Sequence, residues 1–502
     1  MDKRNRLGSS INVNANAQKG TGAASNFQLR SGLIALLFLA IFFVALAPGS
    51  AAARSTPFIT GFSAPDLGLV GPLGYERIKA SGAKTVRVFI FWRTVAPQVK
   101  PARWDPRDPN SPYYYWTDVD AHINAARSAG LSVFVALYQA PEWAERCEYP
   151  KSEGVCDPDP RAFADFATAA AKRYNGQKGA AAIRYWAAWN EPNLPLFFMP
   201  QFQGERKVSP DKYRILLNSM SNAVKRVNRQ NKVINGGLAP LKTPSGIAPL
   251  DFSKRVFCLS GEKRFKSSCR ERTLVDVWST NPYTLGYPNY RPPGKDDVSL
   301  NGLAAMGNLV KAAAAKRKTL SRKTEFWVTE FSWDSDYGAV SEEKLKRWVP
   351  EALHIAYQAG VTRFYWLSLR DWDLASAPLL PGFPGHAGLW RRGATLEQDT
   401  EKLFAQGFRF PMVAYRVAGG IYVWGRTANS RSGPVKIEYS DGSALRYVAT
   451  IRADRNGIFQ KKIRSNLGRD LKGTVRASHD TQISLPFPLA KETMTGYIPP
   501  FG

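Results

Sequence analysis

The sequence predicts an α/β protein, a (β/α)₈ TIM barrel followed by a small C-terminal β-sandwich of the immunoglobulin-like type. Eight short runs rich in β-branched and aromatic residues alternate with longer stretches of helical periodicity. These runs are apolar on both faces, as expected for a parallel sheet covered by helices. From about residue 415, apolar and polar residues alternate instead, and Asp441-Gly442 and Asn456-Gly457 interrupt them as typical hairpin signals.

The expected strands and helices follow one another along the chain. The strands are residues 57–62, 84–91, 131–138, 183–190, 232–237, 274–281, 325–331 and 361–369. The clearest helices are 116–129, 160–174, 210–228, 300–318 and 341–358. Ser341 begins the last helix, where its hydroxyl is expected to cap the first turn. Gly82, Gly130 and Gly360 precede expected strands and are expected to end helices, because glycine readily adopts the positive φ of a helix C-terminus.

An open, doubly wound parallel sheet is the alternative arrangement of the same elements. Such a sheet commonly carries a glycine-rich phosphate loop after its first strand. No loop of that kind follows residues 57–62, so we favour the closed barrel. In a barrel, functional side chains gather at the carboxyl ends of the strands.

The composition divides the chain into three regions: residues 1–53 with an export signal or signal anchor, the barrel at 56–418, and the β-sandwich at 421–502. The signal is predicted from residues 32–47, an uncharged apolar stretch that follows a basic segment and precedes small residues suited to cleavage. This stretch is short for a membrane span, which favours a cleaved signal over an uncleaved anchor. Both alternatives place the remaining chain outside the cytoplasm, secreted or at the cell surface.

The four cysteines form two close pairs in the sequence. Cys147 and Cys156 lie nine residues apart, and Cys258 and Cys269 lie eleven apart. A zinc site is the alternative, but the chain has no C-x-x-C motif and only 4 histidines. In an exported protein this pattern favours two local disulfides.

The formal net charge of +28 is spread along the chain. A nucleic-acid-binding protein would need a basic stripe and an intracellular location, so nucleic acid is not an expected partner. Attraction to an acidic polysaccharide or an anionic cell surface is one interpretation, and solubility through scattered Lys and Arg is the simpler one.

Two of the expected strands, the fourth and the seventh, end in glutamates, Glu191 and Glu330. These strands face each other across an eight-stranded barrel, so both carboxyls are expected at its mouth. Glycosidic cleavage with retention needs such a pair about 5–5.5 Å apart, one to protonate the leaving oxygen and one to attack the sugar. Alone, Glu191 before Pro192 would suit a simple helix start, but the second glutamate favours a catalytic pair.

With these residues the chain resembles the retaining glycoside hydrolases of clan A, which are (β/α)₈ barrels. The resemblance covers about 56–418 and rests on the segments WNEPN (189–193) and WVTEF (327–331). The segments APEW (140–143) and GLW (388–390) bring it nearer to family 39 and its relatives than to family 5.

The resemblance implies a role for each matching residue. By it, Glu191 is the acid/base and Glu330 the nucleophile. Asn190 is implied to donate to the sugar 2-hydroxyl, Arg87 to lie beneath the nucleophile, and Tyr283 to hydrogen-bond to it.

Three further positions concern the substrate side of the site. The resemblance implies that Trp366 forms the floor of the −1 subsite. Where many relatives have His-x-Tyr, this chain has Asn281-Pro282-Tyr283, so Asn281 is expected to bind substrate or support the site. The third strand ends in Tyr138 and Gln139 instead of His.

The predicted function is therefore that of an exported retaining glycosidase, which hydrolyses O-glycosidic bonds of a poly- or oligosaccharide by double displacement. A carbohydrate is the expected partner, and no metal or organic cofactor is expected. Membrane contact is expected only through the N-terminal signal or anchor. The alternatives are a catalytically inactive glycan-binding barrel and a transglycosylase that uses the same residues.

Overall fold

The computed structural model describes residues 56–63, 71–147, 153–177, 179–284, 286–336, 340–373, 385–464 and 473–490. All of them belong to one compact unit, Ser55–Gly502. Within these ranges no helix combines the length and the apolar character needed to cross a membrane. The predicted export signal at residues 32–47 lies outside the described residues.

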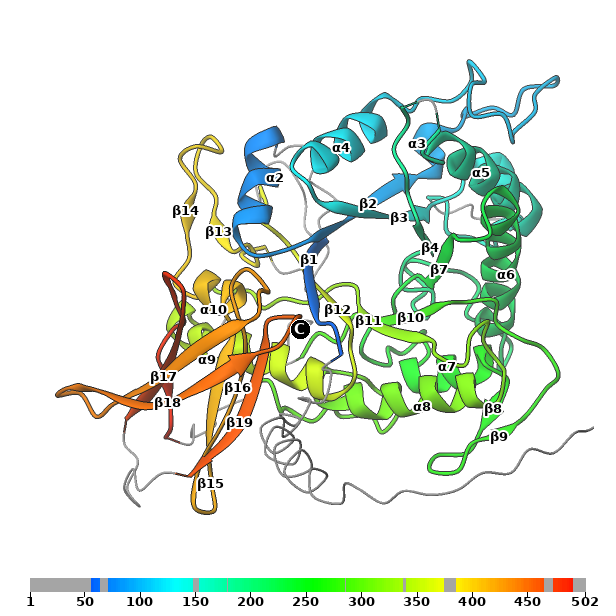
Figure 1. Ribbon diagram of the computed structural model, residues 1–502. Coiled ribbons are helices and arrows are strands. Elements are labelled where there is room, and N and C mark those ends of the chain that lie inside the picture. Colours follow the sequence, from blue (N-terminus) through cyan, green and yellow to red (C-terminus); the bar gives the residue numbers. More distant parts are fainter. Residues whose placement is uncertain are drawn as a thin grey trace, which may run out of the picture. The chain divides into compact units, whose positions relative to one another are not determined.

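Eight parallel strands close into a barrel in the order β1-β2-β3-β4-β7-β10-β11-β12 (Figure 1). Each predicted strand is present, and the observed ones are β1 (Ile59–Ser63), β2 (Thr85–Phe91), β3 (Ser132–Tyr138), β4 (Tyr185–Ala188), β7 (Lys232–Asn235), β10 (Val277–Thr280), β11 (Glu325–Val328) and β12 (Arg363–Trp366). The predicted closed barrel is therefore confirmed. Short hairpins lie between some of these strands, namely β5 (Phe202–Gln203) with β6 (Arg206–Lys207) and β8 (Leu259–Ser260) with β9 (Lys266–Ser267).

The five helices that the sequence predicts are present, although the one expected at 300–318 is α-helical only over Leu303–Ala315. In the described residues, α-helices surround the strands (Figure 1). They are α2 (Gly71–Ala80), α3 (Trp92–Val95), α4 (Thr117–Ser128), α5 (Pro160–Arg173), α6 (Ser209–Val227), α7 (Pro249–Val256), α8 (Leu303–Ala315), α9 (Glu342–Gln358) and α10 (Ala405–Arg409). The Ser341 hydroxyl accepts the Lys344 N–H at 3.4 Å and so caps α9. Gly82, Gly130 and Gly360 have φ of +80°, +79° and +85°, the backbone conformation expected at these helix ends.

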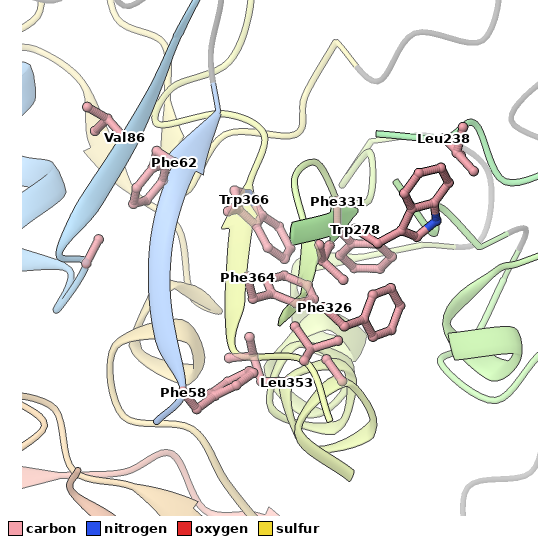
Figure 2. Close-up of a cluster of buried hydrophobic side chains, with 14 of the residues drawn as sticks. Phe58, Phe62, Val86, Leu238, Trp278, Phe326, Phe331, Leu353, Phe364 and Trp366 are labelled. Atoms are coloured by element: carbon pink, nitrogen blue, oxygen red, sulfur yellow. The ribbon is translucent and has the colours of Figure 1, made fainter. Parts of the chain in front are cut away.

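The core has two layers because alternate residues of a strand point to opposite faces. Phe134, Trp327 and Tyr365 fill the barrel interior together with smaller residues from neighbouring strands. The other layer packs between strands and helices, and Figure 2 shows Trp366 there with Phe331.

Two antiparallel sheets follow the barrel and form the predicted sandwich. One has the order β15-β16-β19 and the other β18-β17-β20-β21, with β22 paired to β20. Their bounds are β15 (Met412–Val417), β16 (Gly420–Arg426), β17 (Gly433–Ser440), β18 (Leu445–Ala453), β19 (Ile458–Arg464), β20 (Thr474–His479), β21 (Gln482–Ile483) and β22 (Phe487–Pro488). A further two-stranded pair, β13 (Trp390–Arg391) with β14 (Thr400–Glu401), precedes them.

Two details of the sandwich differ from the sequence-based expectation. Asp441-Gly442 joins the paired strands β17 and β18, as predicted. Asn456-Gly457 also forms a turn, with Gly457 at φ +74°, but the strands that it joins lie in different sheets. Turn residues determine where the chain reverses, whereas side-chain burial determines which strands pair. Strand β15, at 412–417, lies within the range assigned to the barrel but pairs with β16; the division into domains otherwise stays a prediction.

A buried arginine links the first of these sheets to the barrel. Arg426 of β16 is fully buried and donates to Thr60 Oγ1 of β1 at 2.9 Å and to the Phe408 carbonyl at 3.3 Å. Beside it, the ring of His354 on α9 packs on Trp424 with centroids 5.0 Å apart. The β15-β16-β19 sheet is therefore packed against barrel elements.

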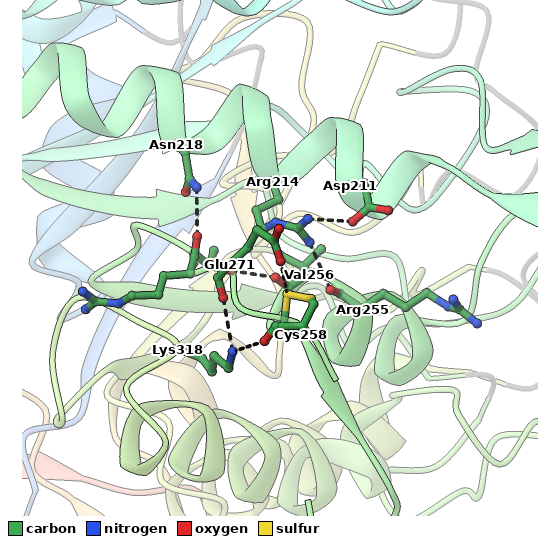
Figure 3. The surroundings of a disulfide bond; sticks show 11 residues. Asp211, Arg214, Asn218, Arg255, Val256, Cys258, Glu271 and Lys318 are labelled. Carbon is green, nitrogen blue, oxygen red and sulfur yellow. Dashed lines mark hydrogen bonds and ion pairs between the residues drawn. A yellow bond between two sulfur atoms is a disulfide. The ribbon is translucent and has the colours of Figure 1, made fainter. Parts of the chain in front are cut away.

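Both predicted disulfides are present. Cys147–Cys156 closes a loop that follows β3, and Cys258–Cys269 brackets the β8–β9 hairpin that leads toward β10. Lys318 donates to the Cys269 carbonyl next to the second disulfide, and Asn218 on α6 donates to the Arg272 carbonyl at 2.9 Å (Figure 3). The second disulfide therefore lies in a segment that is also tied to the surrounding helices.

We expect Gly61→Ala to lower the thermal midpoint of unfolding by several degrees, because crowding a packed core costs about 1–3 kcal/mol. A Cβ at Gly61 would lie 2.5 Å from the Thr85 carbonyl oxygen and 2.7 Å from the Tyr365 ring, inside the barrel. Gly286→Ala is the control, since its Cβ would meet nothing nearer than 3.8 Å. Equal midpoints for the two variants, measured by circular dichroism, would contradict the packing described here.

Candidate active site

Glu191 lies just beyond the carboxyl end of β4, on a backbone that turns sharply. Trp189 and Glu191 have positive φ values of 74° and 39°, which are uncommon for residues other than glycine. The Glu191 N–H donates to the Gly236 carbonyl at 3.1 Å, and the Trp189 N–H donates to the Leu137 carbonyl at 2.9 Å. Neighbouring strands on both sides thus hold the turn in place, and strained backbone of this kind is often found at functional sites.

A buried tyrosine and a glycine bring the ends of β4 and β7 together. Tyr213 of α6 donates to the Ala188 carbonyl at 2.8 Å and accepts the Gly236 N–H at 2.7 Å. A Cβ on Gly236 would lie 2.7 Å from the carbonyl carbon of Trp189, so only glycine allows this approach. The position of the Glu191 backbone therefore depends on both residues.

Glu330 follows β11 and is held by two donors. Arg87 of β2 forms a salt bridge to Oε1, and the Tyr283 hydroxyl donates to Oε2 at 3.3 Å. The Glu330 side chain is 12% exposed, whereas that of Arg87 is 1% exposed. The carboxylate therefore keeps some access to solvent while its partner has almost none.

Arg87 also contacts the residue next to the other glutamate. Its second terminal nitrogen donates to Asn190 Oδ1 at 3.0 Å, and its guanidinium carbon lies 4.2 Å from the centre of the Phe89 ring. A buried cation needs charge and hydrogen-bond partners to offset lost hydration. Glu330 and Asn190 supply them, and Arg87 thereby connects the two strand ends.

Asn281 connects the same two strand ends from the other side. Its Nδ2 donates to Glu191 Oε1 at 2.8 Å, and its Oδ1 accepts the Thr329 hydroxyl at 2.8 Å. Thr329 immediately precedes Glu330 in the chain. Hydrogen bonds and the peptide bonds of adjacent residues thus form a closed ring, which runs through Glu191, Asn281, Thr329, Glu330, Arg87 and Asn190. We call it the carboxylate ring.

The two carboxyls of the carboxylate ring have different surroundings. Burial, and next the charge of Glu330, raise the pKa of Glu191 to about 8, against the hydrogen bond from Asn281 and the charge of Arg87. Burial also raises the pKa of Glu330, while the charge of Arg87 and the hydrogen bond from Tyr283 oppose that rise. At neutral pH this arrangement favours a protonated Glu191 beside an ionised Glu330.

The side chain of Tyr138 lies beside Glu191 in the candidate site. It ends β3, and its ring packs against those of Trp189 and Phe89 at centroid distances of 5.4 Å and 6.2 Å. Burial and the charge of Glu191 raise its pKa, so the hydroxyl stays protonated at neutral pH. It can therefore act as a hydrogen-bond donor.

The structure brings six of the seven predicted site residues together and leaves out Trp366. That side chain is fully buried on the outer face of β12, where its ring contacts Phe331 (Figure 2) and also Phe408. Its indole nitrogen donates to the Ala387 carbonyl at 2.8 Å. The role implied by the resemblance, as the floor of a sugar site, does not fit this position, because Tyr365 and not Trp366 points into the barrel.

Three contributors to the site were missed by the sequence reasoning. The Gly236-Gly237 pair carried a signal, since two glycines at a strand end indicate close backbone approach. Thr329 and Tyr213 carried none, because a buried threonine in a strand and a tyrosine in a helix are ordinary core residues.

No family model matches this sequence, and no curated protein matches it. Among solved structures, a family 39 glycoside hydrolase from Bacteroides cellulosilyticus WH2 aligns over 81% of this chain and 79% of its own, with 14% identity and a TM-score of 0.50. A glucosidase from Croceicoccus marinus aligns over 82% of this chain and 94% of its own, with 15% identity and a TM-score of 0.45. A GH30 endoxylanase from Clostridium papyrosolvens C71 aligns over 82% and 96%, also with 15% identity and a TM-score of 0.45. The chain therefore shares its barrel fold with the family 39 enzyme.

We expect Glu191→Gln to stabilise the protein more at high pH than at low pH. The folded-state pKa of about 8 exceeds the ordinary value of 4.5, so wild-type stability falls as pH rises through this window. The variant carries no charge to bury, and its gain in thermal midpoint should be near zero at about pH 5 and at least about 2 °C at about pH 9.

The matched control is Glu205→Gln, at an exposed glutamate between β5 and β6. Its effect on the midpoint should be the same at both pH values. A gain for Glu191→Gln that does not change with pH would contradict a buried carboxyl with a raised pKa.

Proposed function

We propose that this protein is an exported retaining glycosidase that hydrolyses O-glycosidic bonds of a poly- or oligosaccharide by double displacement. The observation that carries the proposal is the carboxylate ring, which holds two carboxyls in contrasting environments at the ends of β4 and β11. A protonated carboxyl beside an ionised one is the combination that acetal cleavage needs.

In the first step, Glu330 attacks the anomeric carbon and forms a glycosyl ester. The bond from that carbon to the leaving oxygen breaks, and Glu191 gives its proton to this oxygen. Arg87 and Tyr283 hold the Glu330 carboxylate for attack, with Arg87 fixed on its far side by Asn190. Asn190 precedes Glu191 and accepts from Arg87, and its Nδ2, which has no hydrogen-bond partner among the described residues, suits a sugar hydroxyl.

In the second step, Glu191 acts as a base. It takes a proton from water, the water oxygen attacks the anomeric carbon, and Glu330 leaves as a carboxylate. The change of role has an electrostatic cause. Once Glu330 is esterified it carries no charge, so the repulsion that helps to raise the pKa of Glu191 disappears and its ionised form becomes more favourable than before.

The wider features of the chain support an exported, carbohydrate-active protein. Two disulfides are typical of proteins that leave the reducing cytoplasm. The apolar stretch at 32–47 suits an export signal or a membrane anchor. The family 39 enzyme with the same fold is itself a glycoside hydrolase.

Two alternative functions are compatible with the same fold. A barrel that only binds glycans has no need for a buried pair of carboxyls, whose burial destabilises the fold. A transglycosylase uses the same two steps with a sugar hydroxyl in place of water. Product analysis in the presence of an acceptor sugar distinguishes it from a hydrolase.

We expect Glu330→Ala and Glu191→Ala each to lower kcat by about three orders of magnitude or more on the best substrate found in a screen of aryl glycosides and polysaccharides. Glu191→Ala should retain more activity on glycosides with a highly acidic leaving group, since these need no proton. Glu205→Ala is the control and should match the wild type. Near-normal activity of either active-site variant would overturn the role given to that residue.

A further inference from the structure

The relay Thr329–Asn281–Glu191 is the half of the carboxylate ring that ends at Glu191. Each link in it is a hydrogen bond between side chains, at 2.8 Å in both cases. Thr329 and Asn281 are fully buried and Glu191 is 8% exposed. Water therefore has little access to replace a link, and the orientation of the Asn281 amide decides which group faces Glu191.

The Thr329 hydroxyl fixes that orientation. It donates to Asn281 Oδ1, and the described residues offer its proton no other acceptor. If the amide turned around, its NH₂ group would face Thr329 and the hydroxyl proton would lose its partner. Leaving a buried donor unpaired is unfavourable, so Nδ2 stays directed at Glu191.

The backbone around the relay is packed so closely that no side chain fits beside it. A Cβ on Gly237 would lie 2.7 Å from Asn281 Oδ1 and 2.8 Å from Thr329 Oγ1, and Gly237 has φ +69°. Backbone bonds from Asn281 to the Leu238 carbonyl, at 2.8 Å, and from Thr329 to the Thr280 carbonyl, at 3.2 Å, hold the two side chains in register.

The amide orientation has a consequence for the acid. Because Nδ2 donates to Oε1, a proton on Oε1 would point at another hydrogen. Oε2 has no hydrogen-bond partner among the described residues, so it is the oxygen that can carry the proton and release it. A turned amide would instead present Oδ1, which would hold the acid proton on Oε1 and away from a leaving group.

We propose that Thr329 is a positioning residue for the general acid, which orients the Asn281 amide so that Glu191 carries its proton on Oε2. This inference rests on the proposed function, because it takes Glu191 to be the acid. It adds a residue that acts through Asn281 and does not itself contact the substrate.

The test compares Thr329→Val, which removes the hydroxyl at nearly constant shape, with Thr329→Ser, which keeps it. Thr280→Val is the matched control, since Thr280 is equally buried, lies next to Asn281 and donates its hydroxyl proton to the Leu238 backbone carbonyl, at 3.1 Å. The substrates are a phenyl and a dinitrophenyl glycoside of the sugar that the wild type hydrolyses best. The dinitrophenyl group leaves without protonation, so its cleavage does not depend on the acid.

We expect Thr329→Val to lower kcat/KM about tenfold or more on the phenyl glycoside and less than about threefold on the dinitrophenyl glycoside. The alkaline limb of its pH profile should move to higher pH, because a turned amide favours the protonated acid. Thr329→Ser and Thr280→Val should keep the wild-type ratio between the two substrates. Thr329→Ala, which also removes the γ-methyl group, should show the same difference between the two substrates. It replaces the valine variant if that variant does not fold.

An equal loss of kcat/KM on both substrates in Thr329→Val would overturn the proposal. So would a larger loss on the phenyl glycoside than on the dinitrophenyl glycoside in Thr280→Val or Thr329→Ser. If the proposed function itself is wrong and Glu191 is not the acid, Glu191→Ala retains wild-type activity on the phenyl glycoside. An active wild type, an impaired Glu191→Ala and an unaffected Thr329→Val together would reject this inference alone.

Discussion

The site depends on one interaction, the buried guanidinium of Arg87 held between Glu330 and Asn190. A cation with 1% of its side chain exposed has lost nearly all of its hydration, and it can remain charged there only with a carboxylate close by. Phe89 packs against one face of it, and its terminal nitrogens bond to Glu330 and Asn190, which follow two other strands. Arg87 therefore determines where Glu330 lies, and through Asn190 it also fixes the residue next to Glu191.

The difference between the two glutamates follows from this arrangement. Glu330 has a cation and a phenol as partners, whereas the described residues give the Glu191 side chain one neutral amide donor and place it near the charge of Glu330. Burial acts on both carboxyls, so their neighbours must account for the contrast. An acid with a pKa of about 8 beside a carboxylate paired to arginine suits a reaction that needs both protonation states at once. In the proposed mechanism, esterification removes the charge of Glu330 and with it one cause of the raised pKa of Glu191.

The sequence was sufficient for the strands, the barrel and the position of the two glutamates at strand ends, because all three depend on local pattern. Apolar runs between glycine-ended helices mark the strands, and Glu191 and Glu330 are charges at points where such runs end. It was not sufficient where the direction of a side chain matters. Trp366 was expected in the site, but strand alternation places it in the outer layer with Phe331.

The missed features have a related cause. Thr329 acts only because Asn281, which follows another strand, lies within hydrogen-bonding distance, and no pattern in or next to β11 indicates that pairing. Likewise, Asn456-Gly457 predicted a turn correctly, while the sheet that each flanking strand joins depends on contacts distant in sequence.

The most direct measurement is to trap the covalent intermediate. Incubation with activated 2-deoxy-2-fluoro glycosides, which slow the second step more than they slow the first, should leave one sugar attached to the protein. Peptide mass spectrometry should locate that sugar on Glu330, and Glu330→Ala should take up none. A sugar on Glu191, or the same labelling in Glu330→Ala, would contradict the assignment of the two carboxyls on which the proposed mechanism is built.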